Sequence, residues 1–391
     1  MRHSRRTFLR GLSTAAVTSG FVAARGREAL VAFWPDAETA ALEPGGPIIL
    51  ASNENPLGPS ERALAAIRDV VAAKEPGRYP DLALSDLQSA LAAVHGVKPE
   101  NVLLGCGSSQ ILRTVTQLYT GPSRALVTAL PTYEACTRYA ELIGSPVRAL
   151  PLDATLRIDL EATLAAAKGA GLVYFNNPNN PTATLHGARA VDDFVERLAQ
   201  TSPETTILID EAYHDYVTDP AHRTQIPRAA ASPHVIVSRT FSKAHGMAGL
   251  RIGYAVAHAQ TIEDMTRWDG PLAVNCLGLA GALASLSDPA RLRQEAARNT
   301  EARSFTVDAL KRMGYASTDS QGNFVFVDIG RPASAFRESC AKQGVLVARD
   351  FAPFEKTHCR ISIGTLDEMK RAAAVFEKVL FGLPPLPLAS E

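Results

Sequence analysis

Short apolar runs alternate with stretches of helical periodicity over residues 100–255. Compact apolar runs rich in β-branched residues are typical of strands that are buried on both faces. We predict such strands at Val102–Leu104, Ala125–Ala129, Leu172–Phe175, Thr206–Ile209 and Val235–Val237. Strands that alternate with helices favour an α/β domain, with its functional site at the carboxyl ends of the strands.

Helices are predicted where apolar residues recur every three or four positions. Ser60 can cap a first helix, whose apolar face holds Leu64, Ile67 and Val71. Two further helices are predicted from the faces formed by Leu84, Leu87, Leu91 and Val94, and by Val191, Phe194, Val195 and Leu198. Toward the carboxyl end, the pattern predicts one long connecting helix over Arg291–Met313 and a strand over Asn323–Val327.

Composition narrows the function classes. The 391 residues are 46% hydrophobic and 20% charged, which describes an ordinary globular protein. Basic and acidic side chains balance to a formal net charge of zero without a basic block, so a nucleic-acid partner is disfavoured. The five cysteines form no CxxC pair, and the nine histidines form no HExxH motif. We therefore expect neither a disulfide framework nor a metal site.

The amino-terminal residues predict export. Ser4-Arg5-Arg6-Thr7-Phe8-Leu9-Arg10 looks like a twin-arginine signal, and the apolar stretch Gly11–Ala24 that follows offers a cleavage site at Val22-Ala23-Ala24. This stretch is too short to serve as a stable membrane anchor. We expect a signal peptide over residues 1–28 and a periplasmic or otherwise exported protein. The alternative is a basic N-terminal arm on a cytoplasmic protein.

One lysine lies in a segment suited to a cofactor. Ser238–Tyr254 reads SRTFSKAHGMAGLRIGY, with Thr240 and Ser242 beside Lys243 and with Arg251 further on. A lysine amine forms a Schiff base with an aldehyde, and hydroxyls with an arginine suit a phosphate dianion. Pyridoxal 5′-phosphate (PLP) carries both groups. The alternative is a surface lysine in a loop, which the buried strand predicted just before it disfavours.

This segment resembles the cofactor-lysine motif of PLP-dependent aminotransferases of fold type I, in the class I/II branch that includes histidinol-phosphate aminotransferase. The likeness covers nearly everything after residue 44. It implies an α/β fold with a large domain, whose mixed and mostly parallel sheet is flanked by helices, and a smaller α/β domain from both chain ends. We expect an N-terminal arm at 29–43, a small domain from 44–77 and 285–385, and a large PLP-binding domain at 78–284.

Two motifs at predicted strand ends fit the phosphate and the ring of PLP. Gly105-Cys106-Gly107-Ser108-Ser109 lies between a strand and a helix, where free backbone N–H groups and the helix dipole attract anions. Beside Lys243, we expect Gly107, Ser108 and Ser109 to hold the PLP phosphate. The resemblance implies that Tyr133, which follows another strand, stacks on the pyridine ring. Taken alone, the glycine motif would be a turn and Tyr133 a core residue.

Three residues complete the expected cofactor contacts. The resemblance implies that Asn180 and Tyr213 bind the cofactor's 3′-oxygen and that Asp210 pairs with the protonated pyridine nitrogen. A carboxylate keeps the ring cationic and so lets it accept electrons. Taken alone, Asp210 would be an ordinary carboxylate at a strand end. The family usually has glycine where this chain has Ala183, so a positive φ would strain the loop there.

The resemblance also assigns residues to the substrate and to a partner subunit. Arg360 would clamp a carboxylate or a phosphate, which a planar guanidinium binds bidentately, with Arg349 as a second anion contact. Asn55 lies in a segment that lines the substrate side of the pocket in the histidinol-phosphate group. Tyr79 would reach across a dimer interface to the partner's PLP phosphate, which implies a homodimer. The alternatives are a surface arginine for Arg360 and a turn-packing ring for Tyr79.

The implied function is that of an aminotransferase. An amino acid, or a histidinol-phosphate-like amine, would give its amino group to a 2-oxo acid, with Lys243, Asp210 and Tyr213 as catalytic residues. Lys243 would move a proton from the donor's Cα. Decarboxylation of a phosphorylated amino acid on the same fold is the first alternative, because every cofactor contact would be shared. A PLP-sensing regulator is the second, and it would need a DNA-binding domain for which the expected N-terminus is too short.

Overall fold

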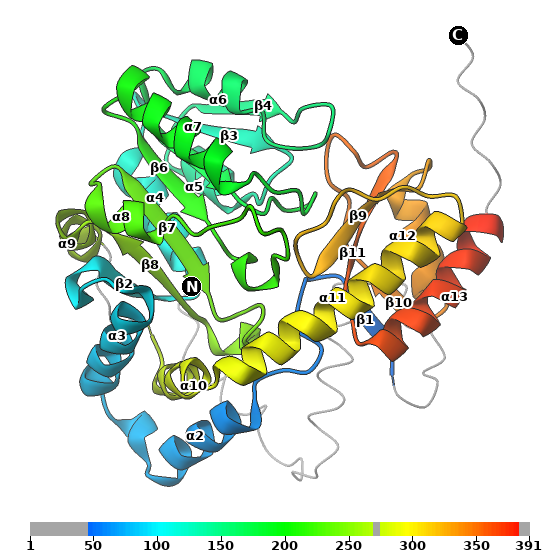
Figure 1. The fold of residues 1–391 in the computed structure, drawn as a ribbon, viewed down its shortest axis with the longest axis horizontal. Helices are drawn as coiled ribbons and strands as arrows, with labels where there is room; N and C mark the ends of the chain where they lie inside the picture. Colours follow the sequence, from blue (N-terminus) through cyan, green and yellow to red (C-terminus); the bar gives the residue numbers. More distant parts are fainter. Residues whose placement is uncertain (1–45, 269–273, 383–391) are drawn as a thin grey trace, which may run out of the picture.

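A seven-stranded sheet forms the centre of the computed structural model, which describes residues 46–268 and 274–382 (Figure 1). The strand order is β2-β8-β7-β6-β5-β3-β4, and only β8 runs antiparallel to its neighbours. The sheet is therefore mixed and mostly parallel, as expected. Its strands are β2 (Val102–Cys106), β3 (Ala125–Leu130), β4 (Val147–Pro151), β5 (Ala170–Asn176), β6 (Thr206–Asp210), β7 (Val235–Thr240) and β8 (Ile252–Ala257).

Both faces of this sheet are buried. Along β6, Ile207 and Ile209 belong to one hydrophobic cluster, whereas Leu208 belongs to another. Successive strand residues point to opposite faces, so two-sided burial explains why these strands read as continuous apolar runs. The helices of this part are α3 (Asp81–His95), α4 (Ser108–Tyr119), α5 (Ala135–Leu142), α6 (Leu160–Ala167), α7 (Ala188–Thr201), α8 (Ile226–Ala231), α9 (Ala259–Trp268) and α10 (Cys276–Leu286).

Local signals account for several helix boundaries. The hydroxyl of Ser60 accepts the backbone N–H of Ala63 at 3.1 Å and starts α2 (Glu61–Ala72), as predicted. Gly96 ends α3 in the left-handed conformation. The apolar faces predicted for α2 and α3 are wrong at Val71 and Val94, which lie in the last turns and are 54% and 59% exposed. The face predicted for α7 is confirmed, because all four of its apolar residues are buried.

Two small sheets form a second part of the molecule. β1 (Ile48–Leu50) pairs in parallel with β10 (Val345–Val347), and β9 (Phe324–Asp328) pairs antiparallel with β11 (His358–Ser362). These strands share a core with α12 (Ala333–Ala341) and α13 (Leu366–Gly382). In Figure 1, the blue β1 lies beside orange and red elements from the other end of the chain. The residue boundaries expected for the two domains stay a prediction, and the expected signal peptide and arm lie outside the described residues.

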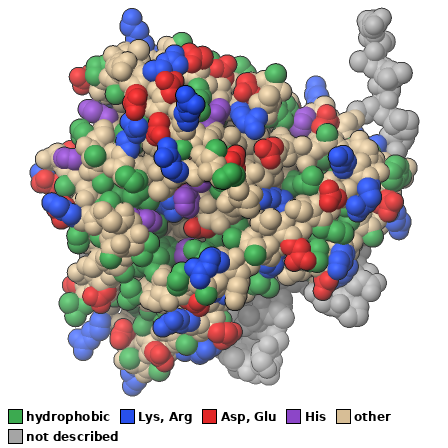
Figure 2. Space-filling view, viewed as in Figure 1, with side chains coloured by type: hydrophobic (Ala, Val, Ile, Leu, Met, Phe, Trp, Pro, Cys, Tyr) green, Lys and Arg blue, Asp and Glu red, His purple; other side chains and the backbone are tan. Residues whose placement is uncertain are grey.

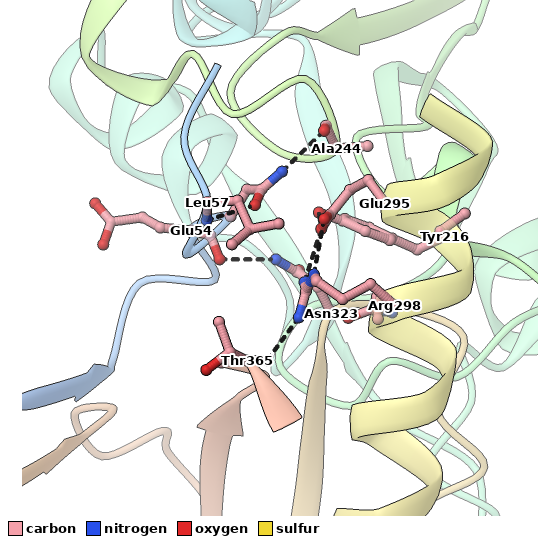
Figure 3. Close-up of polar contacts among 12 residues, drawn as sticks. Glu54, Leu57, Tyr216, Ala244, Glu295, Arg298, Asn323 and Thr365 are labelled. Carbon is pink, nitrogen blue, oxygen red and sulfur yellow. Dashed lines mark hydrogen bonds and ion pairs between the residues drawn. The ribbon is translucent and has the colours of Figure 1, made fainter. Parts of the chain in front are cut away.

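Helix α11 (Pro289–Arg312) runs between the large sheet and the small sheets (Figure 1). It confirms the long connecting helix predicted from the sequence. Its buried Glu295 accepts hydrogen bonds from the hydroxyl of Tyr216 at 3.0 Å and from Arg298 at 2.7 Å. Arg298 also donates to the carbonyl of Gly364 at 2.7 Å (Figure 3). The helix thereby ties the loop after β6 to the chain just after β11.

Charged side chains of both signs are interspersed on the face shown in Figure 2. All five cysteines are free thiols. Within residues 46–268 and 274–382, no group of three or more His, Cys, Asp or Glu side chains is placed to hold a metal ion. No helix in the same ranges is both long and apolar enough to cross a membrane.

Candidate active site

The carboxyl ends of β5, β6 and β7 border a cavity of about 320 Å³. Most of the residues predicted for cofactor and substrate line it: Ser108, Ser109, Tyr133, Asn180, Asp210, Tyr213, Thr240, Ser242, Lys243, Arg251, Arg349 and Arg360. Gly107, Tyr79 and Asn55 do not line it. The other lining residues were not predicted one by one. Ser52, Asn53 and Glu54 lie in the segment around Asn55 that was expected to line the substrate side, and the rest are Thr132, Asn176, Ala212, Ala248 and Phe351.

One end of the cavity is suited to a phosphate group. Gly107 (φ 72) precedes α4 and lies against Arg251, since a Cβ on Gly107 would be 2.3 Å from the Arg251 Nη2 atom. The N-terminus of α4 therefore presents free backbone N–H groups beside a guanidinium. Thr240 donates to the hydroxyl of Ser242 at 2.9 Å, and Arg251 donates to the same hydroxyl at 3.4 Å. These donors together fit the phosphate dianion of PLP.

Asp210 occupies the centre of the sheet edge and is 2% exposed. Its two carboxylate oxygens accept hydrogen bonds from the hydroxyls of Ser238 and Tyr174, each at 2.9 Å. Burial raises the pKa of this carboxyl above its usual value, although these hydrogen bonds act in the opposite direction. A cation beside the carboxylate would reverse that shift. The position therefore suits the protonated pyridine nitrogen of PLP.

The amine of Lys243 points toward the segment before α2. Its Nζ atom donates to the backbone carbonyls of Ser52 at 3.1 Å and Asn53 at 3.0 Å, and it lies 5.7 Å from the centre of the Tyr213 ring. Loss of solvent lowers the pKa of this amine to about 8, and the positive charge of Arg360 adds to the effect. A larger share of the amine is therefore neutral and nucleophilic near neutral pH than for an exposed lysine.

The segment before α2 contributes Asn53 to the cavity, whereas the sequence predicted Asn55. The Asn53 side chain donates to the hydroxyl of Tyr213 at 3.0 Å. Asn55 instead donates to the carbonyl of Ala244 at 3.0 Å and accepts the N–H of Leu57 at 2.9 Å (Figure 3). Asn55 therefore supports the loop that carries Lys243, and its role as a substrate ligand stays a prediction.

The opposite end of the cavity is suited to an anion. Arg360 donates to the Asn180 side chain at 2.7 Å and to the carbonyl of Ala51 at 2.5 Å. Its buried Nε atom has no hydrogen-bond partner within the described chain. Burial lowers the pKa of this guanidinium to about 10. An incoming carboxylate or phosphate would satisfy both the Nε–H group and the charge.

Two side chains near Arg360 shape the same end. Arg349 forms an ion pair with Glu134 at 2.6 Å and stacks on Phe351, with 4.5 Å from its guanidinium carbon to the ring centre. Phe351 also lies under Arg360 at 4.8 Å. Tyr133, which precedes Glu134, is 39% exposed and lines the cavity. Tyr133 therefore lies where its ring could reach a bound PLP, and its stacking on the pyridine ring stays a prediction.

Tyr79 lies apart from this cavity. Its side chain is 86% exposed, and it sits between the short helix η3 (Glu75–Gly77) and α3. In the single chain it lies outside the cavity that includes the phosphate end. Its predicted contact requires a second copy of the chain.

Ala183 has a φ of 57°, which is the left-handed conformation that the sequence analysis identified as strained for alanine. Its methyl group is fully buried in a cluster with Tyr213 and Phe324. Its N–H donates to the carbonyl of Asn179 at 2.7 Å. The chain therefore keeps the backbone turn that a glycine would make and adds one methyl group to the core behind Tyr213.

Comparisons with known proteins agree with this geometry. The sequence profile described as aminotransferase class I and II matches residues 46–376. Histidinol-phosphate aminotransferase of Moorella thermoacetica is 37% identical over 320 residues, 81% of this chain and 81% of that protein. Histidinol-phosphate aminotransferase 2 of Pseudomonas aeruginosa is 36% identical over 340 residues, 87% of this chain and 90% of that protein. The crystal structure of histidinol-phosphate aminotransferase from Sinorhizobium meliloti in complex with pyridoxal-5′-phosphate matches with a TM-score of 0.81 and 28% identity, over 98% of this chain and 99% of that one.

The fold and the arrangement of the site define a PLP-dependent transferase of fold type I. The chain belongs to the class I and II aminotransferase family and is a PLP-dependent aminotransferase. Amino and 2-oxo acids are the substrates of this family.

Three residues that touch the expected functional groups were not predicted from the sequence: Asn53, Tyr174 and Ser238. The register of β6 and β7 places Ser238 directly opposite Asp210. Tyr174 belongs to β5, which is the other neighbour of β6 in the sheet. A predicted strand order would therefore have drawn attention to both hydroxyls. Asn53 carries no comparable signal, because it is one of two asparagines in the same short segment.

Proposed function

We propose that this enzyme transfers an amino group from a donor with an anionic group to a 2-oxo acid, and that Arg360 binds the anion. Arg360 carries the proposal, because it is buried and no carboxylate within residues 46–268 and 274–382 forms an ion pair with it. A buried guanidinium without a counter-ion is costly unless a ligand supplies one. A donor carboxylate or phosphate would do so in the closed site.

The roles of the surrounding residues follow from their positions. PLP, when bound, supplies an aldehyde that takes up the amino group and a ring that stabilises negative charge. The Lys243 amine takes the proton from the donor's Cα, which a lowered pKa favours. Asp210 would hold a positive charge at the pyridine nitrogen, and Tyr213 would donate to the 3′-oxygen. Asn180 lines the same cavity, and its side-chain oxygen accepts a hydrogen bond from Arg360 at 2.7 Å.

We propose a histidinol-phosphate-like amine or an amino acid as the donor, with Arg349 as the second anion contact. The relatives that are named histidinol-phosphate aminotransferase support the first class. The test is to incubate the PLP-loaded enzyme with histidinol phosphate and with single amino acids, without an acceptor, and to measure the carbonyl product. Arg360→Gln should raise KM for anionic donors by about 100-fold. Arg360→Lys should raise KM nearly as much, because a lysine cannot bind the anion bidentately. Release of CO₂ in place of a carbonyl product would contradict the proposal.

We propose a homodimer in which Tyr79 of each subunit completes the partner's phosphate site. The supporting observation is a tyrosine that is 86% exposed and lies outside the cavity of its own subunit. Tyr79→Phe and Lys243→Ala should each lose activity as separate dimers. After mixing under subunit exchange, activity should return, because some mixed dimers hold one site without either substitution. No recovery in exchanged dimers would contradict this arrangement.

We propose that residues 1–28 are a twin-arginine signal and that the enzyme is exported. The proposal rests on Ser4–Arg10 and the apolar stretch after it, which lie outside the described residues. In a host with this export route, the unaltered chain should appear in the periplasm, and the double variant Arg5→Lys with Arg6→Lys should stay in the cytoplasm. Cytoplasmic retention of the unaltered chain would contradict export and support the cytoplasmic alternative.

A further inference from the structure

Asn53 forms hydrogen bonds with two of the predicted catalytic residues, Lys243 and Tyr213, although no role has been assigned to it. It is 1% exposed and has a φ of 54°, which asparagine tolerates better than most residues but which remains uncommon. Its N–H donates to the hydroxyl of Ser362 at 2.8 Å, and that hydroxyl donates to its side-chain oxygen at 2.8 Å. Its carbonyl accepts from Lys243 at 3.0 Å and from Asn323 at 2.9 Å. Backbone conformations of this kind persist where the surrounding structure fixes them, often at functional sites.

The side-chain amide of Asn53 makes the contact that matters for chemistry. It donates to the hydroxyl oxygen of Tyr213 at 3.0 Å. A phenol has one O–H to donate, and this contact uses the oxygen only as an acceptor. The hydroxyl hydrogen of Tyr213 is therefore directed away from Asn53 and left free for the cavity. A donor on the phenol oxygen also makes the O–H group a stronger donor.

We propose that Asn53 is a positioning residue that aims the Tyr213 hydroxyl at the cofactor's 3′-oxygen and fixes it relative to Lys243. This inference rests on the proposed function, in which Tyr213 donates to that oxygen. The same residue is tied through Ser362 to β11, two positions from Arg360 and on the same face of the strand. One asparagine thus connects the cofactor tyrosine, the lysine and the strand that carries the anion site.

The glycine variant isolates the amide. Asn53→Gly keeps the left-handed backbone without strain and keeps the three backbone hydrogen bonds, to Ser362, Lys243 and Asn323, so it removes only the side-chain hydrogen bonds. The readout is a pH titration of the visible absorbance of the resting, PLP-loaded enzyme. Donation to the 3′-oxygen stabilises its deprotonated form, so a weaker donor should move the titration midpoint upward. We expect an upward shift of about half to one pH unit, which corresponds to one hydrogen bond of ordinary strength.

A double-mutant comparison separates positioning from a structural effect. In a Tyr213→Phe background, Asn53→Gly should produce no further shift of the midpoint, because the group through which it acts is gone. An equal shift in both backgrounds, or no shift in the unaltered background, would overturn the inference. If the glycine variant does not fold, Asn53→Asp serves instead: its carboxylate cannot donate to Tyr213 and attracts the hydroxyl hydrogen. The midpoint should then rise above that of the unaltered enzyme, and an unchanged midpoint would likewise overturn the inference.

The same measurements distinguish a failure of the proposed function from a failure of the role of Asn53 alone. If the unaltered protein forms no visible band with PLP, both the proposed function and the inference are wrong. If it forms the band and transfers amino groups while Asn53→Gly leaves the midpoint in place, only the role of Asn53 is wrong.

Discussion

At the scale of single residues, the site keeps three ionisable groups under conditions that favour their neutral forms. Burial raises the pKa of Asp210 and lowers the pKa values of Lys243 and Arg360. A pyridinium beside Asp210 would lower the pKa of that carboxyl again, and a substrate anion beside Arg360 would raise the pKa of that guanidinium again. The shift at Lys243 itself favours the form that reacts. The cofactor-free protein is therefore less stable than it could be, in exchange for a site that is ready to bind.

The burial of the charged Lys243 amine should lower the free energy of unfolding of the cofactor-free protein. Its pKa falls from 10.5 to about 8 on folding, so between these values unfolding takes up a proton. The penalty for the charged amine is fully present below pH 8 and disappears as the pH rises toward 10.5. Lys243→Met should therefore raise the free energy of unfolding at pH 7, and the gain should shrink between pH 8 and pH 10.5.

Urea unfolding of both proteins at pH 7 and pH 10 measures this difference directly. Lys370→Met provides the control, because Lys370 is 54% exposed and makes only a surface ion pair with Asp367. It should change the free energy of unfolding little, and by the same amount at both pH values. A gain at Lys243 that grows with pH would contradict the assigned burial of the amine.

At the scale of elements, the site is built where several strand ends and one helix start meet. β5, β6 and β7 are parallel, so their carboxyl ends lie at one edge and bring Asn176, Asp210 and Thr240 together. The N-terminus of α4 approaches Arg251 closely because Gly107 has no side chain. A Cβ at Gly107 would therefore force the Arg251 side chain to shift away from this end of the cavity.

Gly107→Ala tests that contact. The added Cβ would lie 2.3 Å from the Arg251 Nη2 atom, so the guanidinium must move away from the phosphate position. We expect the dissociation constant for PLP to rise by about tenfold or more, measured by fluorescence titration of the cofactor-free protein. Gly314→Ala is the matched control, because it has a φ of 90° and open space around its Cβ position. It should lower stability by roughly 1 kcal/mol and leave PLP affinity unchanged. Equal affinities for all three proteins would contradict the phosphate assignment.

The sequence predicts most of the elements whose burial is reflected in apolar runs. β5, β6 and β7 are fully buried and were predicted, whereas β4, which exposes most of its residues, was not. β8 is the exception: it is fully buried and apolar but was not predicted as a strand, because its first residues were assigned to the cofactor-lysine segment. Motifs predicted most of the cavity lining. Asn53, which was not predicted, lines the cavity where Asn55 does not, and this depends on the left-handed turn at Asn53, which residue identity alone does not reveal.

At the scale of the whole molecule, helix α11 and the segment before α2 connect the two parts that enclose the cavity. Glu295 on α11 is 1% exposed and joins Tyr216 to Arg298, which reaches the chain after β11. In Figure 3, Asn323 also donates to the carbonyl of Glu54, at 3.4 Å. Relative positions of Lys243 and Arg360 therefore depend on polar contacts far along the chain from either residue.

Glu295→Ala should weaken this connection strongly. It leaves the partly buried Arg298 guanidinium and the buried Tyr216 hydroxyl without their shared acceptor, so we expect a loss of about 3 kcal/mol in the free energy of unfolding. Asp367→Ala, which removes a surface ion pair, should change it by less than about 1 kcal/mol. Chemical denaturation with two spectroscopic probes measures both. Similar small losses for the two variants would show that the α11 contacts do not stabilise the arrangement.

In the proposed function, amino-group transfer in this cavity requires Lys243. The most direct measurement is the absorbance spectrum of the PLP-loaded enzyme before and after a donor pool is added without an acceptor, with product analysis on the same sample. We expect conversion of the cofactor to its aminated form, one equivalent of carbonyl product per site, and a rate lower by about 10²- to 10⁴-fold in Lys243→Ala. An unchanged spectrum with CO₂ release, or full transfer by Lys243→Ala, would contradict this expectation.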